Sequence, residues 1–82
     1  MKYRLYEYDL WGNQVNDVRS TIFIHEIKPE ESDESIIRKV YGENAKIEDF
    51  SIDGDIDGES YIWIDHKGIP DCELRPEADH DK

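Results

Sequence analysis

Three aspartates at alternate positions form the part of this chain that comes nearest to a ligand site. The segment reads Asp-Gly-Asp-Ile-Asp-Gly over residues 53–58 and matches the opening of a calcium-binding EF-hand loop. Calcium is bound by oxygen ligands, and carboxylates two residues apart can converge on one ion where a glycine lets the chain turn sharply. Asp53, Asp55 and Asp57 are therefore candidate calcium ligands.

The rest of that loop does not complete the calcium pattern. The last position of an EF-hand loop is a bidentate glutamate, whereas this chain has Ile64 there, and the flanking residues have the pattern of strands instead of helices. Two interpretations stay open: a looser calcium loop within a hairpin, and a solvated turn whose Asp and Gly residues serve the backbone. We take the turn as the main prediction and expect no cofactor.

The same aspartates belong to a longer acidic segment without any compensating lysine or arginine. Between residues 47 and 66 its carboxylates are Glu48, Asp49, Asp53, Asp55, Asp57, Glu59 and Asp65. Residues 1–46 carry a net charge of −2 and residues 47–82 carry −9, so the total of −11 is concentrated in one half of the chain. A surface that serves only solubility usually mixes both signs. The separation therefore indicates a binding role.

Most of these carboxylates have odd residue numbers, so they share one parity along the chain. Wherever the segment is extended, residues of one parity lie on one face, about 6.6 Å apart. Such carboxylates can imitate the phosphates of nucleic acid, because the Arg and Lys side chains that bind phosphate also accept carboxylates. The segment thus predicts binding to the basic groove of a nucleic-acid-binding protein, with a solubilising face as the alternative.

Other reactive residue types do not combine into a site. His25, His66 and His80 lack metal-ligand spacing, and a single cysteine cannot complete a structural zinc set or an internal disulfide. Cys72 stands between two acidic residues that disfavour its thiolate, so we expect it to be a small buried apolar residue. We expect no catalytic residues and no enzyme activity.

Length and composition allow a single small domain. The chain has 82 residues, 37% hydrophobic and 38% charged, and its nine aromatic residues must supply much of a modest core. No apolar run approaches the roughly 18 residues of a membrane span, and residues 1–4 lead into a strand pattern without a signal segment. We expect a cytoplasmic protein. Its charge disfavours anionic lipid and nucleic acid as direct partners.

The elements that must position these residues can be predicted from periodicity and capping. Alternating aromatic residues over 3–10 indicate a strand, a Gly-Asn turn at residues 12–13 follows, and residues 21–27 are the expected return strand. A helix of about ten residues should be capped by Ser32 or Asp33 and should end before Gly42. Its apolar residues at 36, 37, 40 and 41 form one face.

The second half is predicted to be a run of strands. We expect strands over residues 47–53 and 59–65, a short edge strand over 69–74 because Pro70 cannot donate to a ladder, and a flexible acidic tail over 76–82. The ββαβββ order predicts an α+β domain over residues 1–75. Its antiparallel β-sheet has four to five strands, with one short helix packed on a face.

The two tryptophans have different expected roles. Trp63 lies between two isoleucines in the strongest strand pattern, so we expect it to anchor the core, with an interface role as the alternative. Trp11 lies in a turn, where it either folds back to cover the core or is a hot spot for a partner. The same two roles, core cover or partner contact, are open for Tyr6 and Tyr8.

The residues YRLYEYDLWGN at 3–13, VNDV at 15–18 and CELR at 72–75 resemble small uncharacterised acidic proteins of bacteriophages and prophages. The resemblance covers most of residues 3–75 and carries no assigned chemistry. It implies the bacterial host cytoplasm as the setting. Small acidic phage proteins frequently inhibit host nucleic-acid enzymes or defence systems, including CRISPR effectors, restriction enzymes and DNA-repair glycosylases.

The sequence thus predicts a non-enzymatic, phage-type interaction protein that inhibits a host nucleic-acid-binding protein by DNA mimicry. The expected partner-binding residues are the seven carboxylates of residues 48–65 together with Trp11. One alternative is a calcium-binding domain using Asp53, Asp55 and Asp57. Another is a structural or assembly component that binds through Trp11 and its neighbouring tyrosines.

Overall fold

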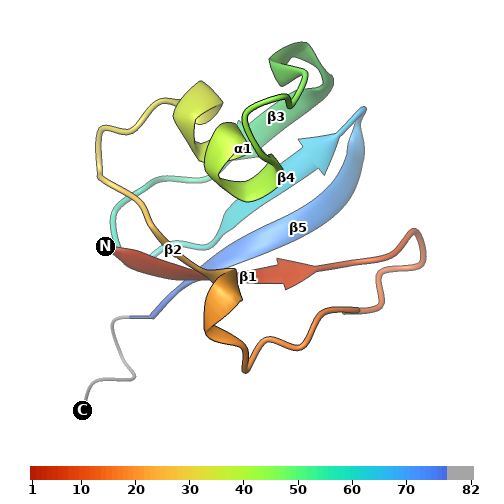
Figure 1. The fold of residues 1–82 in the computed structure, drawn as a ribbon, viewed down its shortest axis with the longest axis horizontal. Coiled ribbons are helices and arrows are strands. Elements are labelled where there is room, and N and C mark those ends of the chain that lie inside the picture. The colour runs from red at the N-terminus through yellow and green to blue at the C-terminus, as the bar shows by residue number, and fades with distance from the viewer. Residues whose placement is uncertain (78–82) are drawn as a thin grey trace.

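The computed structural model describes residues 1–77. These residues form one antiparallel sheet with one α-helix across a face (Figure 1). The strands follow the spatial order β2-β1-β5-β4-β3, and each neighbouring pair is antiparallel. The predicted α+β class and the ββαβββ order are confirmed. The elements are β1 (Lys2–Glu7), β2 (Ile24–Glu26), α1 (Asp33–Tyr41), β3 (Phe50–Asp53), β4 (Ile62–His66) and β5 (Ile69–Pro76).

The N-terminal hairpin has a shorter return strand than the sequence predicts. Thr21–Phe23 form a 3-10 helix, and only Ile24–Glu26 pair with β1. The hydroxyl of Ser20 accepts a hydrogen bond from the Ile22 N–H, and this local bond offers the backbone an alternative to the ladder. β-branched composition alone therefore overstated the length of this strand.

The helix α1 lies where its capping residues place it. The Ser32 hydroxyl accepts a hydrogen bond from the Ser35 N–H at 3.2 Å, and Gly42 ends the helix with a φ of 100°. Ile36 and Ile37 are buried on the predicted apolar face. In the described part of the chain, no helix is long and apolar enough to cross a membrane.

The strand predicted at the sheet edge is in fact central. β5 lies between β1 and β4, which corrects the expectation based on Pro70. β1 pairs with β5 only from Cys72 to Pro76, so Pro70 lies beyond the part of the strand that has neighbours on both sides. A bulge after Ile64 adjusts the β4–β5 register at the same end.

The C-terminal boundary also differs from the prediction. β5 continues to Pro76, so the expected domain end at residue 75 falls inside a strand. The Glu77 N–H donates to the Lys2 carbonyl at 2.9 Å, and its carboxylate pairs with Arg4 at 2.7 Å. The rest of the predicted tail, residues 78–82, lies outside the described residues.

The core lies between α1 and the sheet face that it covers. Its buried side chains are Tyr3, Leu5, Ile27, Ile36, Ile62, Ile64, Cys72 and Leu74. Cys72 is buried as expected, and burial raises the pKa of its thiol to about 12. The prediction for Trp63 is wrong, because Ile62 and Ile64 face the core and strand alternation turns the residue between them to the other face.

Candidate functional site

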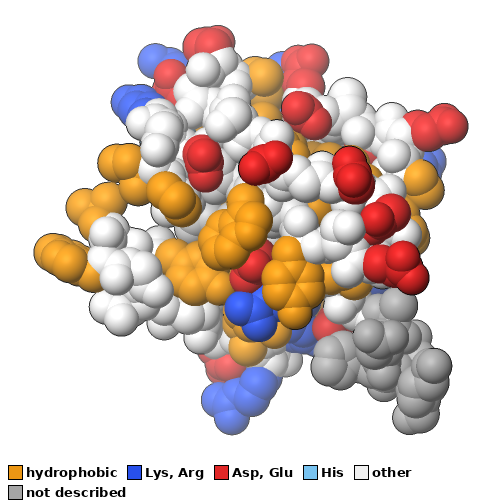
Figure 2. Space-filling view, turned by 180° about the vertical axis from the view of Figure 1, so that it is seen from behind, with side chains coloured by type: hydrophobic (Ala, Val, Ile, Leu, Met, Phe, Trp, Pro, Cys, Tyr) orange, Lys and Arg blue, Asp and Glu red, His pale blue; other side chains and the backbone are white. Residues whose placement is uncertain are grey.

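Within residues 1–77, no α-helix or further strand packs on the sheet face opposite α1. Figure 2 shows this face, with hydrophobic side chains gathered at its centre around a cationic group and acidic side chains along one side. The central residues come from β1 and its extension, from β4 and its preceding residue, and from β5. They are Tyr6, Tyr8, Tyr61, Trp63, Glu73 and Arg75.

Arg75 is held at the centre of this face by rings and a carboxylate. Its guanidinium carbon lies 4.0 Å from the centroid of the Tyr6 ring and 5.2 Å from that of Tyr61. Its Nε donates to Glu73 at 2.7 Å, and this hydrogen bond raises the pKa of Arg75. The Tyr8 hydroxyl donates to the same Glu73 oxygen at 3.0 Å. Glu73 is only 3% exposed, and its hydrogen bonds to Arg75 and Tyr8 hold the cluster in one arrangement. The charge of Arg75 is neutralised by that of Glu73.

A groove of about 540 Å³ runs over the outer face of β5, between the turn after β1 and the strands β3 and β4, and part of its lining belongs to this cluster. Trp63 is 39% exposed on its wall and stacks on Tyr8 with ring centroids 5.8 Å apart. Asp53 lies directly opposite Trp63 on β3, and Asp65 lies two residues further along β4. Within residues 1–77, neither aspartate pairs with a cationic side chain. The groove thus combines an aromatic wall with uncompensated negative charge.

The turn at one end of the groove is built by Asp9. Its carboxylate accepts hydrogen bonds from the N–H groups of Asn13 at 2.8 Å and Trp11 at 2.9 Å, and these bonds lower the pKa of Asp9. Gly12 adopts a φ of 81° in the same turn. Trp11 is held outward and is 83% exposed, so the expectation that it covers the core is wrong. Leu10, at 73%, is exposed beside it.

The predicted acidic residues are distributed along the β3–β4 side of the sheet. Glu48 and Asp49 lie in a 3-10 helix, Ile47–Asp49, before β3, and Asp55, Asp57 and Glu59 lie in the loop after it. The segment is extended over β3 and β4 but not over the 3-10 helix or the loop between the strands, so the carboxylates of one parity do not form a single row. Lys67 donates its N–H to the Asp49 carbonyl at 2.7 Å, which brings a cationic residue to that end. The uncompensated charge is concentrated at the loop and the groove.

The loop over residues 54–61 is anchored to the core and is more than a solvated turn. The Gly58 N–H donates to the hydroxyl of the buried Tyr3 at 2.9 Å, and Ile56 packs against the core. Asp57 accepts hydrogen bonds from the N–H groups of Glu59 at 2.9 Å and Ser60 at 2.7 Å, and these lower its pKa. Asp57 therefore holds the loop in shape.

The same geometry does not favour the calcium alternative. Among residues 1–77, no three His, Cys, Asp or Glu side chains lie close enough together to hold a metal ion. Asp53 lies at the end of a strand, whereas Asp57 is bonded within the loop, so the aspartates do not converge. His80, one of the histidines considered above, lies outside the described residues.

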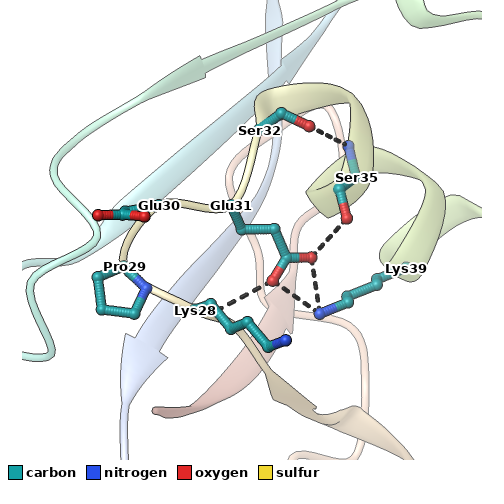
Figure 3. Close-up of a pocket in the computed structure, with 7 residues that line it drawn as sticks. All are labelled: Lys28, Pro29, Glu30, Glu31, Ser32, Ser35 and Lys39. Atoms are coloured by element: carbon teal, nitrogen blue, oxygen red, sulfur yellow. Dashed lines mark hydrogen bonds and ion pairs between the residues drawn. The ribbon is translucent and has the colours of Figure 1, made fainter.

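A second cavity, beside the N-terminus of α1, is accounted for by internal bonding. Figure 3 shows the Glu31 carboxylate turned toward Ser35 and Lys39 beneath the first turn of the helix. It accepts hydrogen bonds from the Lys28 N–H at 3.0 Å, the Ser35 hydroxyl at 2.6 Å and the Lys39 ammonium at 2.8 Å. Burial alone would raise the pKa of Glu31, but these bonds outweigh it and lower the pKa to about 2. The arrangement is structural.

Sequence reasoning missed Tyr61, Glu73 and Arg75. Glu73 and Arg75 alternate with Cys72 and Leu74 in β5, and this pattern indicates a strand with polar side chains on one face. Pro70 led to the prediction of an edge strand instead, so these two residues were not assigned to a site. No family model, curated protein or solved structure matches the chain.

Proposed function

We propose that this chain is a non-catalytic binding protein that docks the sheet face opposite α1 onto the cationic, nucleic-acid-binding surface of a host protein and blocks it. The observation that carries the proposal is the exposed ring of Trp63, stacked on the half-buried Tyr8, next to the uncompensated carboxylates of Asp53 and Asp65.

The composition of this face suits a protein partner. Aromatic residues dominate the energetically important centres of protein interfaces, and a polar rim surrounds them. Here the rings of Tyr61 and Trp63 lie at the centre, and the exposed carboxylates of the β3–β4 loop lie beside them. An apolar centre with a negative rim is complementary to a surface rich in arginine and lysine.

The negative charge makes a nucleic-acid-binding surface the best match. Side chains that bind phosphate through charge-assisted hydrogen bonds also bind carboxylates. A protein that occupies such a surface would exclude nucleic acid directly, without catalysing any reaction. Inhibition by occupation is also the role that the resemblance to small acidic phage proteins suggests.

The test is capture from a bacterial lysate by the full chain, followed by displacement. We expect nucleic-acid-binding proteins to be retained at low salt and to be released by excess duplex DNA, because both ligands compete for one surface. Release should also follow addition of salt, since exposed charges are screened over about 8 Å at physiological ionic strength. Retained proteins that duplex DNA does not displace would contradict the proposal.

A second candidate function, assembly with a partner through apolar contacts, is favoured by the exposed cluster at the rim of the groove. Leu10 and Trp11 protrude from the turn, and Ile69 is half exposed near them. Binding of this kind would survive high salt and neutralisation of Asp53 and Asp65. The same capture experiment therefore separates the two functions.

A further inference from the structure

We infer that the groove beside Trp63 receives the guanidinium of an arginine side chain from the partner protein. This inference rests on the proposed function and names the chemical group that the groove recognises. It is carried by the geometry of the groove and by an arginine that the protein already binds on the same face.

The internal precedent is Arg75. Its guanidinium lies over the Tyr6 ring at 4.0 Å and pairs with the Glu73 carboxylate at 2.7 Å. This is the arrangement in which a planar cation gains from both an aromatic face and a carboxylate. The outer face of this sheet is therefore already suited to an arginine held between rings and an acid.

The groove presents components of the same kinds. Trp63 supplies the aromatic ring, in the role that Tyr6 has beside Arg75. Asp53 and Asp65 supply the carboxylates, in the role that Glu73 has there. Side chains directly opposite each other across two antiparallel strands have Cβ atoms about 5 Å apart, and residues two apart on one strand are about 6.6 Å apart. A guanidinium lying on the Trp63 ring would thus have a carboxylate within reach on each side.

The negative charge of the groove favours a cationic side chain, and its aromatic wall favours arginine over lysine. The groove is lined by the carboxylates of Asp9, Asp53, Asp65 and Glu73 and by one guanidinium, that of Arg75, which is already paired. An ammonium is a compact and strongly hydrated charge, whereas a guanidinium is planar, more weakly hydrated and able to stack on an aromatic ring. Arginine should therefore bind in preference to lysine.

The test is a titration of the full, nitrogen-15-labelled chain with three capped peptides that differ only in their central residue. Gly-Arg-Gly carries the proposed ligand, Gly-Lys-Gly carries a point charge, and the citrulline analogue keeps the shape of arginine without its charge. The readout is the indole N–H resonance of Trp63, which is distinguished from that of Trp11 with the Trp11→Phe variant. We expect the arginine peptide to bind about fivefold more tightly than the lysine peptide, and the citrulline peptide not to bind.

Matched variants separate the groove from the general negative field. Asp53→Asn with Asp65→Asn should weaken binding of the arginine peptide about fivefold, whereas Asp55→Asn with Glu59→Gln removes the same charge from the loop and should change it less than twofold. Trp63→Leu, which lacks the indole and is followed through the backbone amide resonances of Asp53 and Asp65, should weaken binding while leaving both carboxylates in place. Dispersed amide spectra of all variants establish that they are folded.

Some outcomes overturn this inference alone. Equal affinity for the arginine and lysine peptides, or equal losses in the two charge variants, would exclude an arginine-specific groove. Proteins displaced by duplex DNA in the capture experiment would still support the proposed function in that case. Capture that resists duplex DNA would overturn the proposed function whatever the peptides do.

Discussion

At Trp63, the alternation of one strand decides which side chain lies on the open face of the sheet. Ile62 and Ile64 are fully buried, and the residue between them lies on the opposite face next to Tyr8. Three consecutive apolar residues do not reveal by themselves which parity faces the core. The sequence reasoning therefore found the strand but assigned its tryptophan to the wrong side, and with it missed the centre of the candidate site.

Substitution of Trp63 tests this assignment. Trp63→Leu should change the free energy of unfolding by less than about 1 kcal/mol, because the ring is partly exposed. Ile64→Ala, at the adjacent buried position, should cost about 2 to 5 kcal/mol. Urea unfolding of the two variants measures the difference. If Trp63→Leu costs as much as Ile64→Ala, Trp63 belongs to the core.

Glu31 should make stability depend on pH in acid. Its pKa of about 2 in the folded protein lies below the ordinary value of 4.5, so its contribution is complete above about pH 5 and is lost as the pH falls toward 2. The contribution should be about 2 kcal/mol. Glu31→Gln should therefore lower stability at pH 7 and reduce its loss between pH 5 and pH 2, as measured by urea unfolding.

The matched control for Glu31 is its neighbour. Glu30 is exposed and makes no ion pair among residues 1–77, so Glu30→Gln removes the same charge without removing those bonds. Its unfolding should follow that of the unmodified chain at each pH. Equal effects of the two substitutions would mean that net charge, and not the bonding of Glu31, sets the acid sensitivity.

At the scale of elements, the helix was predicted well and the strands less well. The limits of α1 follow from Ser32 and Gly42, which are local signals that the sequence states directly. Strand order depends on long-range pairing, and Pro70 gave a misleading signal because it lies at the hairpin end of a central strand. The anchoring of Gly58 by Tyr3, far apart in sequence, had no local signal at all.

The loop after β3 should be sensitive at Gly54. A Cβ there would lie 2.6 Å from the Tyr61 carbonyl oxygen, and the φ of 118° is strained for any other residue. Gly54→Ala should therefore cost about 3 kcal/mol. Gly12→Ala is the control, since its φ of 81° is also positive but its Cβ would meet open space, and it should cost about 1 kcal/mol. Equal losses in thermal or urea unfolding would exclude the clash.

At the scale of the whole molecule, the sequence predicted the architecture and the charge separation, but not which side chains lie on the open face of the sheet. The ββαβββ order and the apolar stripe of one helix were enough to predict a half-covered sheet. The arrangement of rings and carboxylates on the open face depends on register, which a shift of one residue would reverse. Register was not readable from the apolar run around Trp63.

The net charge of −11 should make the folded state sensitive to salt. Raising sodium chloride from 0.01 to 0.15 M shortens the screening length from about 30 to 8 Å, so self-repulsion falls and Tm should rise by several degrees. Asp55→Asn with Glu59→Gln should reduce this dependence. A Tm that does not change with salt would mean that the acidic side chains do not repel one another appreciably in the fold.

The most direct test of the central claim is to neutralise one face at a time. Asp53→Asn with Asp65→Asn alters the open sheet face, and Glu30→Gln with Glu43→Gln removes the same charge from exposed positions on either side of α1. Retention of lysate proteins that duplex DNA can displace is then compared at low salt. We expect the first variant to lose these proteins and the second to keep them. Equal retention by both variants would contradict binding through the open face.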